Sequence, residues 1–277
     1  MSNSDSPAIQ SPFTFSQSSL EDFERCRRRF FLRYVEGLEW PARAASGPFE
    51  ASLRQRQRFH RLLRQHFIGV DVEEVIQAEP PGSTIRAWWE AFRRYPPALP
   101  AGEKYPEVLL STPMGEHRLA ARFDLLAVGD DGRGRIVDWK TGRPPSRSDE
   151  LAESWQSVVY LYVLAVAGAP YFGGLPPAPA AIDMLYWLAE LPASPILAPY
   201  SSEAHARAGR RLSEQIATIA GLPASAFEPC EDQSTCAYCE YQGYCRRGTA
   251  LLEPDQELEL EYEDEEWYWA DAPEYEC

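Results

Sequence analysis

In the middle of the chain, apolar residues stand at every second position from Leu119 to Ala127. This period of two predicts a half-buried strand over residues 117–128. Residues 130–134 include two Asp and two Gly, which favour a turn because Gly adopts positive φ and Asp tolerates it. A second strand is predicted to begin at Ile136 and to end at residues 141–142. The pattern therefore predicts a β-hairpin.

A period of about 3.6 residues predicts helices on both sides of this hairpin. Ser18 and Glu21 have the spacing of a capping box, so the first helix is predicted to begin at Ser18 and to end near Glu36. The other predicted helices span residues 50–67, 84–95, 149–166 and 201–220, and the other predicted strands span 105–112 and 181–188. A chain of 277 residues with these elements fits one large α/β domain or one domain with appendages.

The composition divides the chain into three parts. Residues 1–15 are rich in Ser and Pro and are predicted to be a disordered N-terminus. Residues 16–252 are the predicted folded domain, and residues 253–277 form an acidic tail. Within the domain, three aromatic residues of the 84–95 helix are expected to belong to the core rather than to a base-stacking platform: Trp88, Trp89 and Phe92.

The chain shows no sequence feature of a membrane or secreted protein. No apolar run reaches the roughly 18–20 residues that a membrane span needs. The first residues lack the basic and hydrophobic regions of a secretory signal. We therefore expect a cytoplasmic protein whose thiols stay reduced. Clustered cysteines in such a protein are expected to be metal ligands rather than disulfides.

The net charge of −15 is unevenly distributed. The tail of residues 253–277 holds twelve acids and no Lys or Arg, and the rest of the chain carries 30 acids and 27 bases. Much of the positive charge lies in two arginine runs, over residues 25–33 and 54–64. Such runs suit contacts with a phosphate backbone, although they are equally typical of the solvated faces of two helices.

The hairpin brings Asp124, Asp138 and Lys140 towards one end of a small sheet. Carboxylates among apolar neighbours are costly to bury unless they are paired or bind a metal. Carboxylate oxygens suit Mg²⁺ or Mn²⁺, and the lysine is placed to act on a nucleophile or on developing charge. Only Lys104 and Lys140 are lysines among 27 basic residues, so the choice of Lys at this position is notable. The alternative is a solvated hairpin with an ordinary ion pair.

Residues 138–142 (D-W-K-T-G), together with the upstream Asp124, resemble the PD-(D/E)XK nuclease superfamily and, more narrowly, its RecB-type branch. The resemblance implies an α/β fold of the restriction-endonuclease type, with a central mixed β-sheet flanked by helices. It also implies metal binding by Asp124 and Asp138, with help from the Trp139 carbonyl. Lys140 would act on the nucleophile or the transition state.

The resemblance gives roles to residues outside the hairpin. His60 on an early helix is a predicted metal ligand, with His66 as a competitor and a solvent-facing histidine as the alternative. Gln156 and Tyr160, four apart on one helix face, are predicted to position substrate. An acid on the strand before the hairpin, Glu107, can add to the metal site or can simply face solvent.

Three arginines are predicted to contact substrate. Arg27 and Arg28 follow Cys26 in a segment that resembles the opening of RecB-type nucleases with an iron–sulfur cluster. Arg122 stands where the family usually has Gly, two residues before Asp124. A large cation at that position could contact a substrate phosphate or crowd the metal, and in the second case activity would suffer.

The segment Cys236-x₂-Cys239-x₅-Cys245 is a compact loop of three thiols. A four-ligand site needs one more, for which Cys26 is our choice and Cys230 the runner-up. By resemblance, the four cysteines would hold a 4Fe–4S cluster that joins the N- and C-terminal regions, and Zn²⁺ is the alternative. Cys277 is expected to be free.

The resemblance implies a metal-dependent DNA nuclease, most simply a single-stranded DNA exonuclease. It would act in CRISPR spacer acquisition or in DNA repair, beside CRISPR adaptation or helicase–repair proteins. The competing hypothesis is an iron–sulfur DNA-binding or accessory subunit with weak or lost nuclease activity, and a weaker one is a zinc-stapled structural subunit. The acidic tail is either a solvating segment or a nucleic-acid mimic that occupies the arginine-lined groove.

Overall fold

The computed structural model describes residues 6–38, 47–142, 148–236 and 239–245. A six-stranded mixed sheet forms its centre. The strands are β1 (Thr14–Phe15), β2 (Gly102–Met114), β3 (His117–Gly129), β4 (Gly134–Lys140), β5 (Ile182–Leu188) and β6 (Ile196–Pro199). β1 is parallel to β3, and β4 is parallel to β5, whereas the pairs β2–β3, β3–β4 and β5–β6 are antiparallel. The predicted α/β fold, a central mixed sheet flanked by helices, is confirmed.

The helices are α1 (Gln17–Arg25), α2 (Arg27–Phe30), α3 (Gly47–Phe67), α4 (Glu73–Gln77), α5 (Thr84–Arg94), α6 (Ser148–Glu153), α7 (Trp155–Ala167) and α8 (Ser202–Ala220). A π-helical segment, Phe31–Val35, continues α2. Short 3₁₀ turns cover Ala169–Tyr171, Pro179–Ala181, Ala224–Ala226 and Gln233–Cys236. Of these described helices, none is long and apolar enough to span a membrane.

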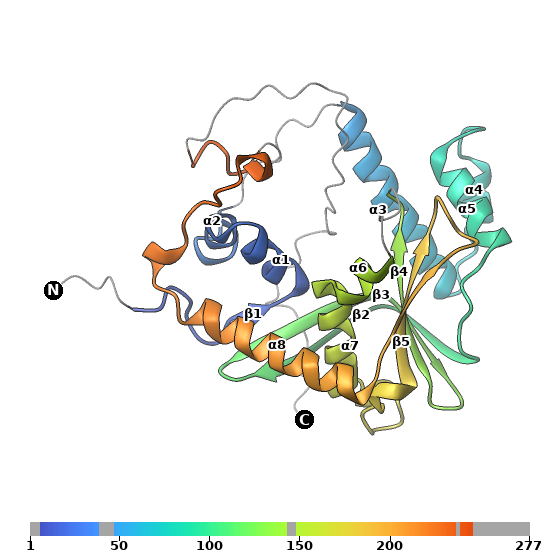
Figure 1. Ribbon diagram of the computed structural model, residues 1–277. Coiled ribbons are helices and arrows are strands. Elements are labelled where there is room, and N and C mark those ends of the chain that lie inside the picture. The colour runs from blue at the N-terminus through green and yellow to red at the C-terminus, as the bar shows by residue number, and fades with distance from the viewer. Residues whose placement is uncertain (1–5, 39–46, 143–147, 237–238, 246–277) are drawn as a thin grey trace.

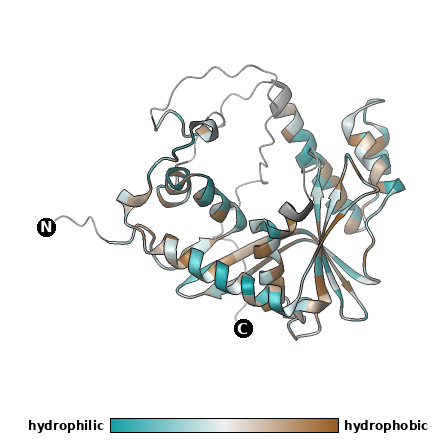
Figure 2. Ribbon diagram, in the orientation of Figure 1, coloured by the Kyte–Doolittle hydropathy of each residue, from teal (hydrophilic) through white to brown (hydrophobic). Residues whose placement is uncertain are grey.

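The helices lie on the two faces of the sheet (Figure 1). One face packs against α1, α7 and α8 through a core that includes Phe123, Ile136 and Tyr186. The other face packs against α3 and α5 through a core that includes Leu125 and Trp187. In Figure 2, α8 is teal over much of its length, while brown apolar residues lie along the strands behind it. The sheet is therefore buried on both faces by helices.

Strand β3 is the point where the sheet forks. All of β2 runs along one edge of β3, with pairs from Gly102–Gly129 to Met114–His117. The other edge is shared, because β1 pairs with residues 118–119 and β4 pairs with residues 125–128. Asp124 lies between these two stretches, so its backbone pairs with neither β1 nor β4. We call this position the fork of the sheet.

The pleat of β3 also changes at Asp124. Leu119, Ala121 and Phe123 pack on the α7 side, but Leu125 packs on the α3 side. In a regular strand these four residues would share one face, as the period of two predicted. Opposite Asp124 in the β2–β3 register, Glu107 has a φ of 55°. The prediction of a single apolar face from Leu119 to Ala127 is therefore wrong, because the strand twists at this position.

The first predicted helix is wrong in its start and in its length. Ser16, not Ser18, caps α1, because its side chain accepts from the amide of Ser19 while the Ser19 hydroxyl accepts from the amide of Ser16. The helix then ends at Arg25, because Cys26 has an extended backbone. The serine cluster offers several caps with similar sequence patterns, so the sequence alone does not distinguish Ser16 from Ser18.

Several other boundaries differ from the predictions. The predicted helix over 149–166 is two helices, since Ser154 ends α6 and caps α7 through the amide of Ser157. α3 begins three residues earlier than predicted, and β1, α4 and β6 were not predicted. The helix over 84–95, the strand over 181–188 and the helix over 201–220 are confirmed to within a residue as α5, β5 and α8. The aromatic residues of α5 are buried, as expected.

The N-terminal segment predicted to be disordered is attached to the domain where it is described. The amide of Ala8 donates to the carbonyl of Leu222 at 2.9 Å, and Phe13 accepts from the amide of Arg118 at 2.9 Å. With β1, these contacts hold residues 6–15 against β3 and the segment after α8. Residues 1–5 and the acidic tail over 253–277 lie outside the described residues.

Replacing Gly102 by alanine is expected to destabilise the domain by about 2–4 kcal/mol. Gly102 begins β2 with a φ of 143°, and a Cβ there would overlap the carbonyl oxygen of Val128 and lie 3.0 Å from the Cα of Gly129. Urea unfolding would measure the loss. Gly115→Ala is the matched control, because Gly115 has a φ of 63° but no atom near its Cβ position. It should cost only about 1–2 kcal/mol, and an equal loss at both sites would contradict the steric argument.

Candidate active site

Asp124 and Asp138 come together where β3 and β4 part. The antiparallel register ends at Leu125–Val137, so the next opposed pair is Asp124 and Asp138. Instead of a backbone bond at this level, the Asp124 Oδ2 accepts the amide hydrogen of Trp139 at 2.9 Å. This bond fixes one carboxylate at the fork, directly beside the strand that carries the other.

His60 reaches the same carboxylate from α3. Its Nδ1 lies 3.4 Å from Asp124 Oδ1. Burial disfavours the charged form of Asp124, but His60, the Trp139 amide and Lys140 outweigh it and hold the pKa of the carboxyl below its usual value. Asp124 is therefore a carboxylate at neutral pH, ready to serve as an anionic ligand.

Asp138 is held from the opposite face of the sheet. Gln156 of α7 donates from Nε2 to Asp138 Oδ1 at 2.6 Å, and Lys140 Nζ lies 3.3 Å from Asp138 Oδ2. The same ammonium lies 5.7 Å from the ring centroid of Tyr186. Asp138 and Gln156 are buried, whereas Lys140 is partly exposed at the end of β4. The lysine thus bridges a buried carboxylate and the solvent side of the site.

Of the other predicted residues, Tyr160 lies on the same helix as Gln156, whereas His66 lies among aromatic side chains. Tyr160 lies one turn beyond Gln156, with its ring 5.2 Å from that of Phe123. His66, the competitor of His60, packs among Phe67, Trp89 and Phe92 instead. Burial, and next the charge of Arg93, lowers the pKa of His66. His60 is therefore the histidine that the fold brings to the carboxylates.

Arg122 and Glu107 face one another beside the fork. The Arg122 Nε lies 3.8 Å from Glu107 Oε2, and both side chains are partly exposed. The Glu107 backbone is in the left-handed region, which costs a non-glycine residue on the order of 1–3 kcal/mol. Strained residues of this kind cluster at functional sites. Arg122 therefore has a carboxylate partner outside the pair Asp124 and Asp138.

The donor set fits a hard divalent cation. Two carboxylates at opposed positions of adjacent strands repel one another unless positive charge lies between or beside them. Here the Lys140 ammonium supplies positive charge beside Asp138. Among the residues that the structure describes, no three His, Cys, Asp or Glu side chains stand in a geometry ready to hold a metal ion. The fit therefore rests on ligand chemistry, since oxygen ligands and one imidazole suit Mg²⁺ or Mn²⁺.

A comparison with known protein families shows which family the chain belongs to. The model of the PD-(D/E)XK nuclease superfamily matches residues 14–246, which include all of the elements described above. The chain belongs to the PD-(D/E)XK nuclease superfamily. No curated protein matches its sequence.

Two solved structures are similar to this PD-(D/E)XK chain. One is SSO0001, with 14% identity and a TM-score of 0.39, covering 86% of this chain and 87% of the other. The second is a candidate exonuclease from Eubacterium rectale, with 11% identity and a TM-score of 0.47, covering 87% of this chain and 90% of the other. At these scores and identities, the likeness carries no weight for function.

Four cysteines of this PD-(D/E)XK chain, Cys26, Cys230, Cys236 and Cys239, lie near the break between α1 and α2. The amide of Cys230 donates to Cys26 Sγ at 3.4 Å, and the Cys230 and Cys236 sulfur atoms are 3.9 Å apart. Cys239 is buried nearby, and burial raises its pKa to about 11. Burial, followed by Cys26 and Cys236, raises the pKa of Cys230 to about 12. The runner-up ligand, Cys230, thus lies beside both Cys26 and Cys236.

The arginine run after Cys26 is partly internal. Arg29 is buried and its Nε lies 2.8 Å from Asp22, while Arg33 approaches the same carboxylate at 3.3 Å. The Arg27 and Arg28 guanidiniums lie over the rings of Phe23 and Phe31 at 5.4 and 5.3 Å. Of the two predicted substrate contacts in this run, Arg27 is exposed and Arg28 is half-buried.

Two residues near the site were not predicted from the sequence. Tyr186 lies opposite Asp138 in the β4–β5 register, and its hydroxyl bonds with that of Ser157 at 2.7 Å. Arg56 of α3 lies against Gly142, with its Nη2 3.4 Å from where a Cβ would stand. Tyr186 lies on a predicted strand that neighbours the strand of Lys140, and this position could have indicated a place in the site. Nothing in the sequence marked Arg56 except its place in the second arginine run.

Proposed function

We propose that this chain is a metal-dependent deoxyribonuclease of the RecB type, a cytoplasmic exonuclease that hydrolyses single-stranded DNA. The observation that carries the proposal is the convergence of Asp124, Asp138 and Lys140 at the fork of the sheet, with His60 on one face and Gln156 on the other. Family membership gives the reaction class, phosphodiester hydrolysis. By resemblance, its setting is CRISPR spacer acquisition or DNA repair.

Asp124, Asp138 and His60, with the Trp139 carbonyl, would hold Mg²⁺ or Mn²⁺. Such an ion, when bound, supplies Lewis-acid polarisation of the phosphate and lowers the pKa of water. Hydrolysis adds water across a P–O bond, so the attacking oxygen loses a proton and the leaving oxygen gains one. The Lys140 ammonium, partly exposed beside Asp138, is placed to donate hydrogen bonds to the attacking water or to the phosphate oxygens.

Gln156 and the Trp139 amide orient the two carboxylates. Gln156 donates to one oxygen of Asp138, which leaves the other oxygen on the Lys140 side. The Trp139 amide likewise donates to Oδ2 of Asp124, which leaves Oδ1 on the His60 side. Residues that orient metal ligands in this way typically contribute 10- to 100-fold in affinity or activity, as an order of magnitude. Tyr160, one turn along α7 from Gln156, would contact the substrate.

We further propose that Cys26, Cys236, Cys239 and Cys245 hold a 4Fe–4S cluster, with Cys230 as the alternative ligand and Zn²⁺ as the alternative metal. The support is the gathering of soft sulfur donors at the break between α1 and α2. The centre would join two segments about 200 residues apart in sequence. Anaerobic purification with iron and sulfide analysis would distinguish a 4Fe–4S cluster from Zn²⁺. Broad absorbance near 400 nm is expected, and a colourless zinc protein would contradict the cluster.

The test of the proposed nuclease uses anaerobically purified protein and end-labelled single-stranded DNA with Mn²⁺ or Mg²⁺. Shortening of the strand from one end is expected with metal and none with excess chelator. Lys140→Ala protein, purified identically, controls for contaminating nucleases. Internal cuts would make the enzyme an endonuclease. DNA binding without cleavage would reject hydrolysis and favour an accessory DNA-binding subunit.

A further inference from the structure

The long helix α3 carries a row of arginines on the side that faces away from the core. Arg54, Arg58, Arg61 and Arg64 are exposed, while Phe59, Leu62 and Leu63 on the opposite side are buried. Neither Arg61 nor Arg64 forms an ion pair with any residue that the structure describes. The row is therefore more than a solvated face balanced by acids, because its positive charge is only partly neutralised within the fold.

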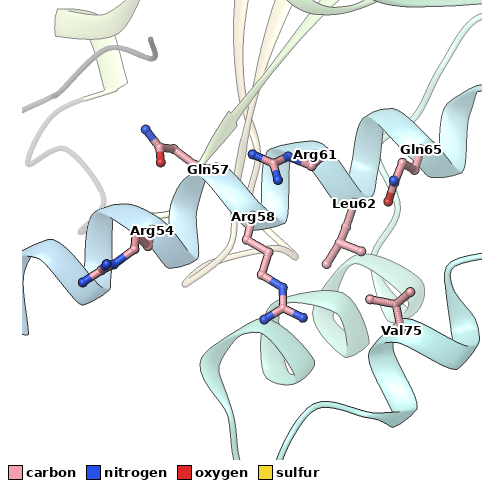
Figure 3. A pocket seen from close by; sticks show the side chains of 7 residues that line it. All are labelled: Arg54, Gln57, Arg58, Arg61, Leu62, Gln65 and Val75. Atoms are coloured by element: carbon pink, nitrogen blue, oxygen red, sulfur yellow. The ribbon is translucent and has the colours of Figure 1, made fainter.

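A cavity of about 410 Å³ lies along this row, between α3 and α4. It is lined by Arg54, Gln57, Arg58, Arg61, Leu62, Gln65 and Val75. Figure 3 shows Arg54, Arg58 and Arg61 following one another along α3, and Leu62 pointing towards Val75 of the neighbouring helix. The lining thus combines guanidinium and amide donors with a small apolar wall, and the volume is in the range of ligand sites.

Two acids of the neighbouring segment are engaged with arginines. Buried Glu79 forms an ion pair with Arg58, and Glu73 approaches Arg93 at 3.7 Å. Only Val75 of α4 lines the cavity. The lining therefore presents three guanidinium groups, of which Arg58 is held in place by Glu79 and Arg61 forms no ion pair with a described residue.

The cavity lining and His60 lie on neighbouring rows of α3. Residues three or four apart are neighbours on a helix. Gln57 is three residues before His60, and Arg61 is four residues after Gln57. His60 lies 3.4 Å from Asp124, and Arg56 lies against Gly142, two residues after Lys140. An anionic chain that leaves the carboxylates can thus follow α3 from His60 to Gln57 and on to Arg61 and Arg54.

We propose that this cavity binds the phosphodiester backbone of the nucleic-acid strand at nucleotides away from the scissile bond. This inference rests on the proposed nuclease function and adds a second contact for the same substrate. Guanidinium groups suit phosphate oxygens because they present several donors in a fixed plane. Gln57, Gln65 and the apolar pair Leu62 and Val75 give a nucleoside further contacts without selecting a sequence. The contact raises affinity for strands long enough to span both places.

The test compares the double variant Arg54→Gln/Arg61→Gln with wild type. Binding of fluorescent single-stranded DNA is measured without divalent metal over a series of salt concentrations. Loss of two phosphate contacts should reduce the slope of log affinity against log salt by about 1.4, which is roughly a tenfold or greater loss at about 0.1 M salt. The matched control is Arg207→Gln/Arg210→Gln on α8, which removes the same charge from another helix.

A short substrate separates this inference from the proposed function. A thymidine ester of p-nitrophenyl phosphate has one phosphodiester and cannot reach the cavity. Its hydrolysis should be unchanged in Arg54→Gln/Arg61→Gln, while the KM for long DNA rises. If Lys140→Ala hydrolyses the ester as fast as wild type, the proposed function fails instead.

Three results would overturn the inference. An equal weakening by the α8 control would show a general charge effect, and an unchanged salt slope would show that the cavity makes no phosphate contact. Tighter DNA binding by Arg54→Gln/Arg61→Gln would make an acidic segment of the chain the occupant, since residues 253–277 hold twelve acids. A reduced salt slope in Arg54→Gln/Arg61→Gln, with an unchanged slope in the α8 control, supports a nucleic-acid strand as the occupant of the cavity.

Discussion

Lys140→Ala is expected to slow phosphodiester hydrolysis on the order of 100- to 1,000-fold, because it removes a preorganised donor from the place where charge develops. The ammonium lies 3.3 Å from Asp138 and near the ring of Tyr186, so its position is fixed by two neighbours. Initial rates with end-labelled DNA and with the nitrophenyl ester would measure the loss. It should appear in kcat for both substrates, since the lysine acts at the reacting phosphate.

Metal binding gives the control for this variant. Lys140 is a positive charge beside a proposed ligand, so Lys140→Ala should bind Mn²⁺ at least as tightly as wild type, as followed by the loss of the free Mn²⁺ resonance. Lys104→Ala is the matched substitution of the other lysine, whose ammonium bonds to the carbonyls of Pro100 and Gly102. It should keep full activity. Equal rates for Lys140→Ala and wild type would remove the lysine from the mechanism.

Asp124→Asn is expected to lose both Mn²⁺ binding and hydrolysis, with a rate reduction on the order of 1,000-fold or more. The substitution keeps the shape of the side chain but removes the negative charge that His60, the Trp139 amide and Lys140 all stabilise. Calorimetric titration with Mn²⁺ and the same rate assays would measure the two losses.

Asp183→Asn is the matched control for Asp124→Asn, because it also replaces a carboxylate by an amide. Asp183 is a carboxylate on β5 that pairs with Arg135 at 2.6 Å and is not a proposed ligand. It should change stability but leave Mn²⁺ affinity unchanged. If Asp124→Asn still bound Mn²⁺ as tightly as wild type, the metal site would have to be placed elsewhere. If it kept its rate as well, the fork of the sheet would not be the active site.

The central hairpin could be predicted because its signals are local. An alternating strand, a turn rich in Asp and Gly and a second strand fix which residues oppose one another, so Asp124 and Asp138 were expected together. The twist at Asp124 could not be predicted in the same way. It depends on the sharing of one β3 edge by β1 and β4, and the two residues of β1 are too few to leave a periodic pattern.

Choices between similar residues needed the tertiary structure. His60 and His66 lie on the same helix, and only packing shows that His66 is enclosed by Phe67, Trp89 and Phe92 while His60 reaches Asp124. The place of Cys230 depends in the same way on a contact with Cys26 across 204 residues of sequence. Such long separations carry no local pattern from which the contact could be predicted.

The contact between Cys26 and Cys230 also sets an order of events during synthesis. At about 5–20 residues per second, the ribosome makes Cys230 about 10–40 s after Cys26. The β3–β4 hairpin and its first helices are complete well before that time, so the catalytic fork can assemble while the N-terminal helix still waits for its partner segment. A group held by Cys26 and Cys230 together would therefore bind only after this later segment has been made.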